Sequence, residues 1–175
     1  MDYFEVFGLP RLLGIDTAAL EKTFHALSRK YHPDYFTTAS PAEKTQAVRM
    51  TALLNDAYRA LRHPLHRVEY LVRVCGFKAD GSKVPQSLLI EVFEINEQLE
   101  EVKAGRASLE EVDSLRTQIK EKRERFDLEL RQASLEWDEL VKGGAPEAKL
   151  RAHLARLAEI LSESAYIRNL EKETE

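Results

Sequence analysis

The sequence predicts an all-α protein, and three features of its 175 residues support this fold class. Apolar residues recur at spacings of three and four rather than two, which is the periodicity of amphipathic helices. Glycine and proline are few, with seven and six residues, and runs of β-branched residues are absent. We therefore expect an N-terminal helical hairpin followed by a C-terminal antiparallel three-helix bundle or coiled coil.

The hairpin is predicted from two amphipathic segments with clear helix boundaries. The first helix is predicted over residues 17 to 31. Asp16 or Thr17 can cap its start by accepting hydrogen bonds from the free N–H groups of the first turn. Ser40-Pro41-Ala42-Glu43 is a capping-box pattern that opens a helix of about twenty residues, and His63-Pro64 should end it. The two helices carry facing apolar stripes and are separated by about eight residues, which predicts an antiparallel pair.

Three longer helices are predicted in the second half of the chain. A short helix over about 65 to 74 precedes a linker at 76 to 85, which divides a first domain (1–75) from a second (86–175). The long helices span about 86 to 103, about 108 to 142, and the residues after the turn at 143 to 146. We assign Trp137 to the core, because it lies in the middle of a seam. The apolar residues at seam spacing in the second and third long helices are Val112, Leu115, Ile119, Phe126, Ala133, Trp137, Leu140, Leu150, Leu154, Leu157, Leu161 and Ala165.

Composition excludes several classes of function. The net charge of −4 divides into +2 for residues 1–75 and −6 for 76–175, so no clustered basic footprint for nucleic acid is present. No apolar run is long enough to span a membrane, and the first residues lack the pattern of a secretory signal. The single cysteine, Cys75, excludes an internal disulfide and a cysteine-rich zinc site, and is interpreted as a small buried hydrophobe. We expect no cofactor and no metal.

His32-Pro33-Asp34, at the predicted tip of the hairpin, admits three interpretations. In the first it is only a turn, in which proline ends the helix and aspartate makes a local hydrogen bond. In the second His32 is a general base oriented by Asp34, although no nucleophile or polarising group is evident nearby. In the third the rigid tip presents a ring and a carboxylate to a partner protein at little entropic cost.

The arrangement around this tripeptide resembles a J-domain, the activator module of DnaK-type chaperone ATPases. The resemblance rests on the helix that ends in Tyr31-His32-Pro33-Asp34, on the capped helix that ends in residues 55 to 61, and on a start, residues 2 to 9, similar to the family's first short helix. It implies that His32, Pro33 and Asp34 stimulate ATP hydrolysis by another protein.

The basic residues before the tripeptide are expected to help bind the chaperone. Lys22, Arg29 and Lys30 form a short cationic strip that would steer the tip toward an acidic groove. The resemblance is imperfect here, because Phe24, His25 and Ala26 stand where many J-domains carry bases. Tyr35 likewise follows the tripeptide where a base is common. These departures favour a dedicated chaperone over a general one.

Residues 63 to 71, HPLHRVEYL, resemble one branch of this group, the HscB family of co-chaperones for iron–sulphur cluster biogenesis. With the domain order and length, the resemblance covers essentially the whole chain. It implies a non-enzymatic adaptor whose partners are a specialised, HscA-like DnaK-type chaperone and the cluster scaffold protein IscU. Human-type members carry an additional N-terminal zinc segment and a targeting sequence. Neither occurs in this chain, so we expect a bacterial cytoplasmic protein.

The helix over 86 to 103 has more apolar residues than one seam requires. Leu88, Val92, Ile95, Leu99 and Val102 fill the seam, while Leu89, Ile90 and Phe93 are left beside Glu94, Glu97 and Glu101. An apolar patch edged by carboxylates is typical of a partner surface. The matching positions of the HscB family bind the scaffold, so the resemblance implies that role for these six residues and for Tyr166. The alternative is that Leu89 or Ile90 packs on another part of the chain.

Three alternatives to this function stay open at this point. The chain could be a J-domain adaptor for another client, or a coiled-coil interaction protein whose tripeptide is only a turn. As an enzyme with His32 as base, it would instead have an activity that needs no chaperone.

Overall fold

The computed structural model describes residues 2–77 and 86–174, except for the side chains of 86–89, 91–92, 165, 168–169, 171 and 173–174. All the regular elements in these ranges are helical: α1 (Tyr3–Val6), α2 (Thr17–Lys30), η1 (Pro33–Phe36), α3 (Pro41–Arg62), α4 (Pro64–Val74), α5 (Gln86–Lys103), α6 (Leu109–Lys142) and α7 (Glu147–Thr174). The predicted fold class is confirmed. None of these helices, as far as they are described, is long and apolar enough to cross a membrane.

The helices begin and end within a residue or two of the predicted positions because the predicted caps are formed. Asp16 Oδ1 accepts hydrogen bonds from the N–H groups of Ala18 and Ala19 at 2.9 and 3.1 Å. Ser40 and Glu43 make the reciprocal bonds of a capping box at the start of α3. The helices α2 and α3 then pair through a stack of Phe24 on Tyr58, whose ring centroids are 4.2 Å apart.

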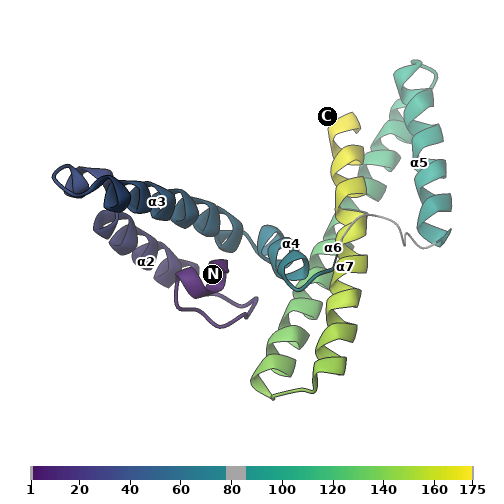
Figure 1. The fold of residues 1–175 in the computed structure, drawn as a ribbon. Helices are drawn as coiled ribbons and strands as arrows, with labels where there is room; N and C mark the ends of the chain where they lie inside the picture. The colour runs from purple at the N-terminus through teal and green to yellow at the C-terminus, as the bar shows by residue number, and fades with distance from the viewer. Residues whose placement is uncertain (1, 78–85, 175) are drawn as a thin grey trace.

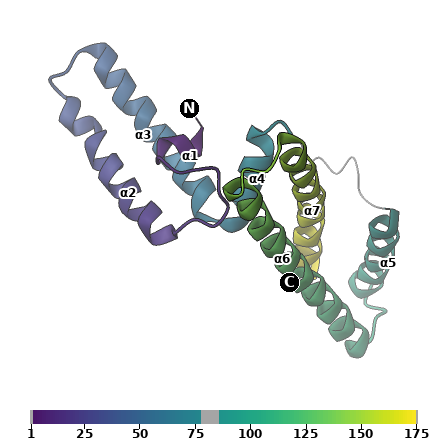
Figure 2. The ribbon, with the colours of Figure 1, turned by 90° about the horizontal axis from the view of Figure 1, so that it is seen from below.

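The α2–α3 hairpin and α5 lie on opposite sides of the molecule. Figures 1 and 2 show the hairpin extending away from the α6–α7 pair, with the turn between α2 and α3 at its far end. Both views place α4 between the hairpin and the α6–α7 pair, and α5 beyond that pair. The tip of the hairpin and α5 are therefore free to contact two different partners.

The main core joins both halves of the chain. It includes Phe4, Leu20 and Leu61 from the hairpin side and Phe126, Trp137 and Leu157 from α6 and α7. The prediction that Trp137 is a core residue is confirmed. Much of the predicted linker, residues 78–85, lies outside the described residues, and the division into domains 1–75 and 86–175 stays a prediction.

A smaller core holds α5 against the ends of α6 and α7. It consists of Ile95 and Leu99 from α5, Leu115 and Ile119 from α6, and Leu170 from α7. Leu88 and Val92, predicted for the same seam, have side chains outside the described set. The face of α5 that carries Ile95 and Leu99 is thus its buried face.

Buried polar groups lock the loop between α1 and α2 onto α6. Asp138 accepts hydrogen bonds from the backbone N–H groups of Leu13 and Gly14 at 2.6 and 2.7 Å. Trp137 Nε1 donates to the backbone oxygen of Arg11 at 2.8 Å. Arg67 of α4 donates to the backbone oxygens of Leu13 and Leu61. These bonds fix the position of the hairpin relative to α6, and the sequence patterns did not predict them.

Cys75 is half-buried at the end of α4 and packs against the main core. Burial raises the pKa of its thiol, with the nearby Arg11 opposing the shift. A thiol of this kind is a poor nucleophile at neutral pH, in agreement with the interpretation of Cys75 as a small hydrophobe.

Candidate functional sites

The tripeptide begins a short 3-10 helix at the tip of the hairpin, in which His32 is the N-cap and Pro33 and Asp34 are the first residues of η1. His32 is extended, with φ −62° and ψ 131°, because a residue before proline avoids the α region. The N–H of Tyr35 donates to the backbone oxygen of His32 at 3.0 Å, and the N–H of Asp34 donates to His32 Nδ1 at 3.3 Å. The local backbone is a turn of 3-10 helix, which was not predicted, and its side-chain hydrogen bond is accepted by His32 rather than by Asp34 as the turn interpretation expected.

The hydrogen bond to Nδ1 determines what His32 and Asp34 can offer a partner. A ring nitrogen that accepts a hydrogen bond carries no proton, so the proton of the neutral ring lies on Nε2. Asp34 Oδ2 lies 3.4 Å from the same Nδ1, which cannot donate to it in this tautomer. The side chain of Asp34 is 83% exposed, and its carboxylate faces solvent. An Nε2–H donor and a carboxylate acceptor are both available for recognition.

A cavity of about 450 Å³ beside the tripeptide tests the enzyme hypothesis. It is lined by His25, Ser28, Arg29, His32, Asp34 and Tyr35. A base in a Ser-His-Asp arrangement needs its Nδ1–H bonded to the carboxylate and its other nitrogen bonded to the hydroxyl. Here Nδ1 accepts a backbone N–H instead, and within the described residues no hydrogen bond joins Ser28 to His32. This geometry favours recognition over catalysis.

The three predicted cationic residues occupy different positions around the tip. Arg29 lines the cavity beside the tripeptide. Lys22 lies two turns earlier on α2 on the same stripe, since seven residues separate it from Arg29. The Nζ of Lys30 lies 5.4 Å from the centre of the Tyr31 ring. The structure brings only Arg29 next to His32 and Asp34, and all three contacts with a chaperone stay predictions.

The exposed face of α5 is an apolar patch bordered by carboxylates. Phe93 is 69% exposed and Ile90 is 56% exposed, so the alternative that Ile90 packs inside the chain is wrong. The predicted acidic residues on this helix are also exposed: Glu94, Glu97 and Glu101. The side chain of Leu89 lies outside the described residues. We call Ile90, Phe93, Glu94, Glu97 and Glu101 the α5 surface.

Glu101 and Tyr166 have contacts that limit their part in this surface. Arg106 donates to both oxygens of Glu101 at 2.7 Å, and this hydrogen bonding lowers the pKa of the Glu101 carboxyl. Tyr166 is half-buried and packs against the core that holds α5 to α6 and α7. It therefore supports α5 from the inside, and a direct role in binding stays a prediction.

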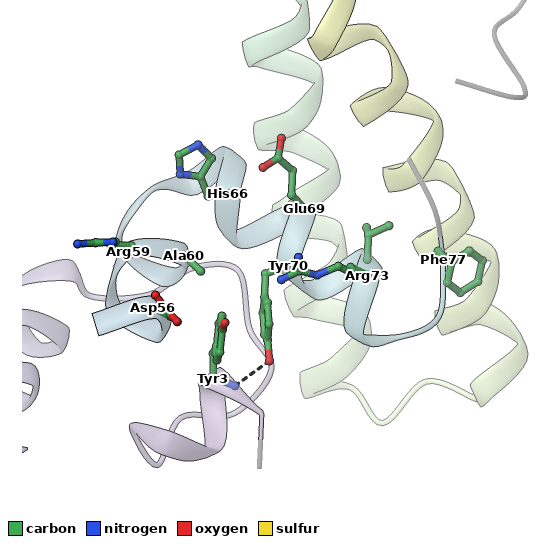
Figure 3. A pocket seen from close by; sticks show the side chains of 10 residues that line it. Tyr3, Asp56, Arg59, Ala60, His66, Glu69, Tyr70, Arg73 and Phe77 are labelled. Atoms are coloured by element: carbon green, nitrogen blue, oxygen red, sulfur yellow. Dashed lines mark hydrogen bonds between the residues drawn. The ribbon is translucent and has the colours of Figure 1, made fainter. Parts of the chain in front are cut away.

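Another cavity lies elsewhere, where α1, α3 and α4 meet. Its volume is about 590 Å³, and Figure 3 shows Tyr3 and Tyr70 side by side within it. Their rings are stacked with centroids 4.1 Å apart, and the N–H of Tyr3 donates to the Tyr70 hydroxyl at 2.8 Å. Burial raises the pKa of Tyr70, and the guanidinium of Arg73 lies 5.5 Å from its ring centre. These contacts hold α1 against α4. Sequence reasoning missed them because nothing in the spacing of the two tyrosines, 67 residues apart, indicates that they meet.

Comparisons with known proteins agree on one family. The family model described as the HSCB C-terminal oligomerisation domain matches residues 84–175. A co-chaperone protein HscB homolog from Neisseria meningitidis is 37% identical over 134 residues, which are 75% of this chain and 80% of the relative. The crystal structure of human co-chaperone protein HscB aligns with a TM-score of 0.70 and 27% identity, covering 99% of this chain and 80% of the human one. Chaperone HscB from Vibrio cholerae aligns with a TM-score of 0.61 and 28% identity over the full length of both chains.

Proposed function

Because the chain belongs to the HscB family of co-chaperones, we propose that it stimulates ATP hydrolysis by a specialised, HscA-like DnaK-type chaperone and delivers the iron–sulphur scaffold IscU to it. The observation that carries this proposal is the exposed tripeptide His32-Pro33-Asp34 at the end of a hairpin that projects from the rest of the molecule (Figure 1). We place this activity in the bacterial cytoplasm.

The tip supports the chaperone half of the proposal through its rigidity and its exposed polar groups. Two hydrogen bonds to His32 fix the backbone of η1, so little conformational entropy is lost on binding. The side chains of His32 and Asp34 are 54% and 83% exposed, and Arg29 lines the same cavity. In this arrangement the tip changes the chaperone by contact, and ATP is hydrolysed entirely on the chaperone.

The α5 surface supports the scaffold half. Phe93 and Ile90 supply the apolar centre that a protein interface buries, and Glu94 and Glu97 supply an acidic rim, at one end of which Glu101 is paired with Arg106. This pattern suits a scaffold with an apolar recess and basic residues around it. The buried residues Ile95 and Leu99 hold the helix in place from behind.

The positions of the two surfaces suggest why one chain carries both. Because the tip and the α5 surface lie on opposite sides of the molecule, a chaperone and a scaffold can bind at once without a clash (Figure 2). Both partners held on one chain have a raised effective concentration toward each other. The buried contacts of Trp137 and Asp138 also give the hairpin a fixed direction.

Single-turnover ATP hydrolysis by a co-encoded DnaK-type chaperone tests the proposal. The intact chain should accelerate hydrolysis, and the scaffold should enhance the acceleration further. His32→Gln should remove the acceleration with and without scaffold. Phe93→Ala should reduce the enhancement that is due to the scaffold. Point variants are preferable to separate halves because the main core joins both halves of the chain.

Two results would contradict the proposal in different ways. If the intact chain does not accelerate hydrolysis, the chaperone half is wrong. If it accelerates hydrolysis but does not bind the scaffold, the chain is a J-domain adaptor for another client.

A further inference from the structure

Tyr35 is the most exposed aromatic ring among the described residues, with 72% of its surface accessible. It directly follows the tripeptide within η1, and its N–H is hydrogen-bonded to the backbone of His32. Its ring meets the ring of His32 edge-on, with centroids 6.3 Å apart and planes at 75°. A short, hydrogen-bonded turn therefore holds this large apolar group out into solvent beside the two polar groups of the tripeptide.

An isolated exposed hydrophobe would need no explanation, but the surroundings of Tyr35 are specific. The ring lines the same cavity of about 450 Å³ as His32, Asp34 and Arg29. The adjacent stripe of α2 carries Lys22 and Arg29, which adds positive charge along one side. The tip thus combines a protruding aromatic ring with cationic neighbours.

We propose that Tyr35 is an anchor of the chaperone-binding surface, and that its ring enters an apolar recess of the ATPase whose rim is acidic. This inference rests on the proposed function. Tyrosine is enriched among the residues that dominate binding energy because it brings a large apolar area with few rotatable bonds. The cations on α2 match an acidic rim and mainly speed the encounter, whereas the ring determines how long the complex lasts.

The contribution of the Tyr35 ring to binding and that of the cations on α2 should respond differently to salt. Interactions between exposed charges are screened as ionic strength rises, while burial of a ring is not. An anchor also changes the concentration of co-chaperone needed for half-maximal stimulation and leaves the maximal rate alone. The tripeptide, in contrast, should determine the maximal rate.

The test measures single-turnover ATP hydrolysis against the concentration of the full-length chain, at low and at physiological salt. Tyr35→Ala should raise the half-saturating concentration about tenfold or more at both salt concentrations, with the maximal rate unchanged. Tyr35→Phe keeps the ring and should bind within about twofold of the parent, whereas Tyr35→Lys should bind as weakly as Tyr35→Ala. Leu135→Ala is the matched control, since it removes another exposed apolar side chain, 60% accessible on α6, and should change nothing.

The outcomes separate this inference from the proposed function. If the parent chain stimulates hydrolysis, His32→Gln abolishes the stimulation, and Tyr35→Ala has the parent's half-saturating concentration, only the anchor is wrong. The anchor is also wrong if Tyr35→Lys binds as well as the parent, or if Tyr35→Phe loses as much as Tyr35→Ala. If the parent chain gives no stimulation, the proposed function fails and the anchor with it.

Discussion

Two aspartates show how differently the junction and the tip of this molecule use the same side chain. Asp138, at the junction between α6 and the N-terminal loop, is 4% exposed and accepts two backbone hydrogen bonds of 2.6 and 2.7 Å. Asp34, at the tip, is 83% exposed, and its described contact is the 3.4 Å approach to His32. The hydrogen-bonding capacity of Asp138 serves the fold, whereas that of Asp34 is left for a partner.

The junction needs the charge of Asp138 because Arg67 is buried with it. Arg67 is 4% exposed, and among the described residues its Nη2 has no hydrogen-bond partner. Burial lowers the pKa of Arg67, and the charge of Asp138 opposes this shift. A buried cation without a nearby anion is strongly destabilising, so the two charges depend on each other although the loop lies between them.

The largest predicted effect is the loss of stability when Asp138 at the junction loses its charge. Asp138→Asn keeps the shape of the side chain but places an NH₂ group against the N–H of Leu13 or Gly14, and it removes the charge that opposes Arg67. We expect the free energy of unfolding to fall by about 3 kcal/mol in a urea titration followed by circular dichroism.

The matched control for this change is Asp127→Asn, on the same helix. Asp127 is about half exposed and pairs only at the surface with Arg123, at 3.1 Å. Its replacement should cost less than about 0.5 kcal/mol. Equal losses for the two variants would mean that the buried contacts of Asp138 do not hold the junction together.

The second prediction makes the same substitution at the tip. Asp34→Asn removes a charge that faces solvent and leaves the backbone bond from Asp34 N–H to His32 in place. The free energy of unfolding should change by less than about 0.5 kcal/mol. Stimulation of the chaperone should fall by at least about tenfold, measured by single-turnover hydrolysis, because a charged hydrogen bond to the partner is lost. A destabilised Asp34→Asn variant with normal stimulation would reverse the contrast between the two aspartates.

The third prediction concerns the other exposed ring. Phe93→Ala should weaken binding of the scaffold about tenfold by isothermal titration calorimetry, because the ring is the largest apolar group of the α5 surface. The control is Leu128→Ala, which shortens an apolar side chain of similar exposure, 56%, on α6. If both variants bind like the parent chain, the scaffold contacts another part of the molecule.

The sequence predicted the parts of this molecule that depend on neighbouring residues. The helix boundaries follow from caps within four residues, such as Asp16 and the Ser40 to Glu43 box. The two faces of α5 also follow from local periodicity, which separated the buried Ile95 and Leu99 from the exposed Ile90 and Phe93. In each case the information lies within one helix.

The sequence did not predict contacts between residues far apart in the chain. The bonds from Leu13 and Gly14 to Asp138 span 125 and 124 residues. These contacts depend on how the hairpin packs on α6, and periodicity carries no information about this packing.

The smallest predicted effect concerns a third carboxylate, which is exposed to solvent but hydrogen-bonded within the chain. Glu43, at the start of α3, accepts hydrogen bonds from the Ser40 hydroxyl at 2.6 Å and from the Ser40 N–H at 2.8 Å. The bond from the hydroxyl, followed by that from the backbone, lowers the pKa of Glu43 from its usual value of 4.5. Its contribution is therefore fully present above pH 4.5 and is lost as the pH falls through the lowered pKa.

Amide hydrogen exchange at Ser40 measures this effect directly, since its N–H is the one that Glu43 holds. The protection factor, corrected for the intrinsic pH dependence of exchange, should fall below about pH 4.5 as the carboxylate is protonated and the first turn of α3 frays. Glu43→Gln keeps an acceptor that does not titrate, so its protection should be lower but independent of pH over the same range. Within the described part of the chain, the side chain of Asp34 makes no such bond. Asp34→Asn should therefore leave the amide exchange of the neighbouring residues unchanged. If Ser40 stays protected when Glu43 of the parent chain is protonated, the cap does not depend on the charge of Glu43. The hydrogen bonds of this exposed carboxylate would then make no measurable contribution to the fold.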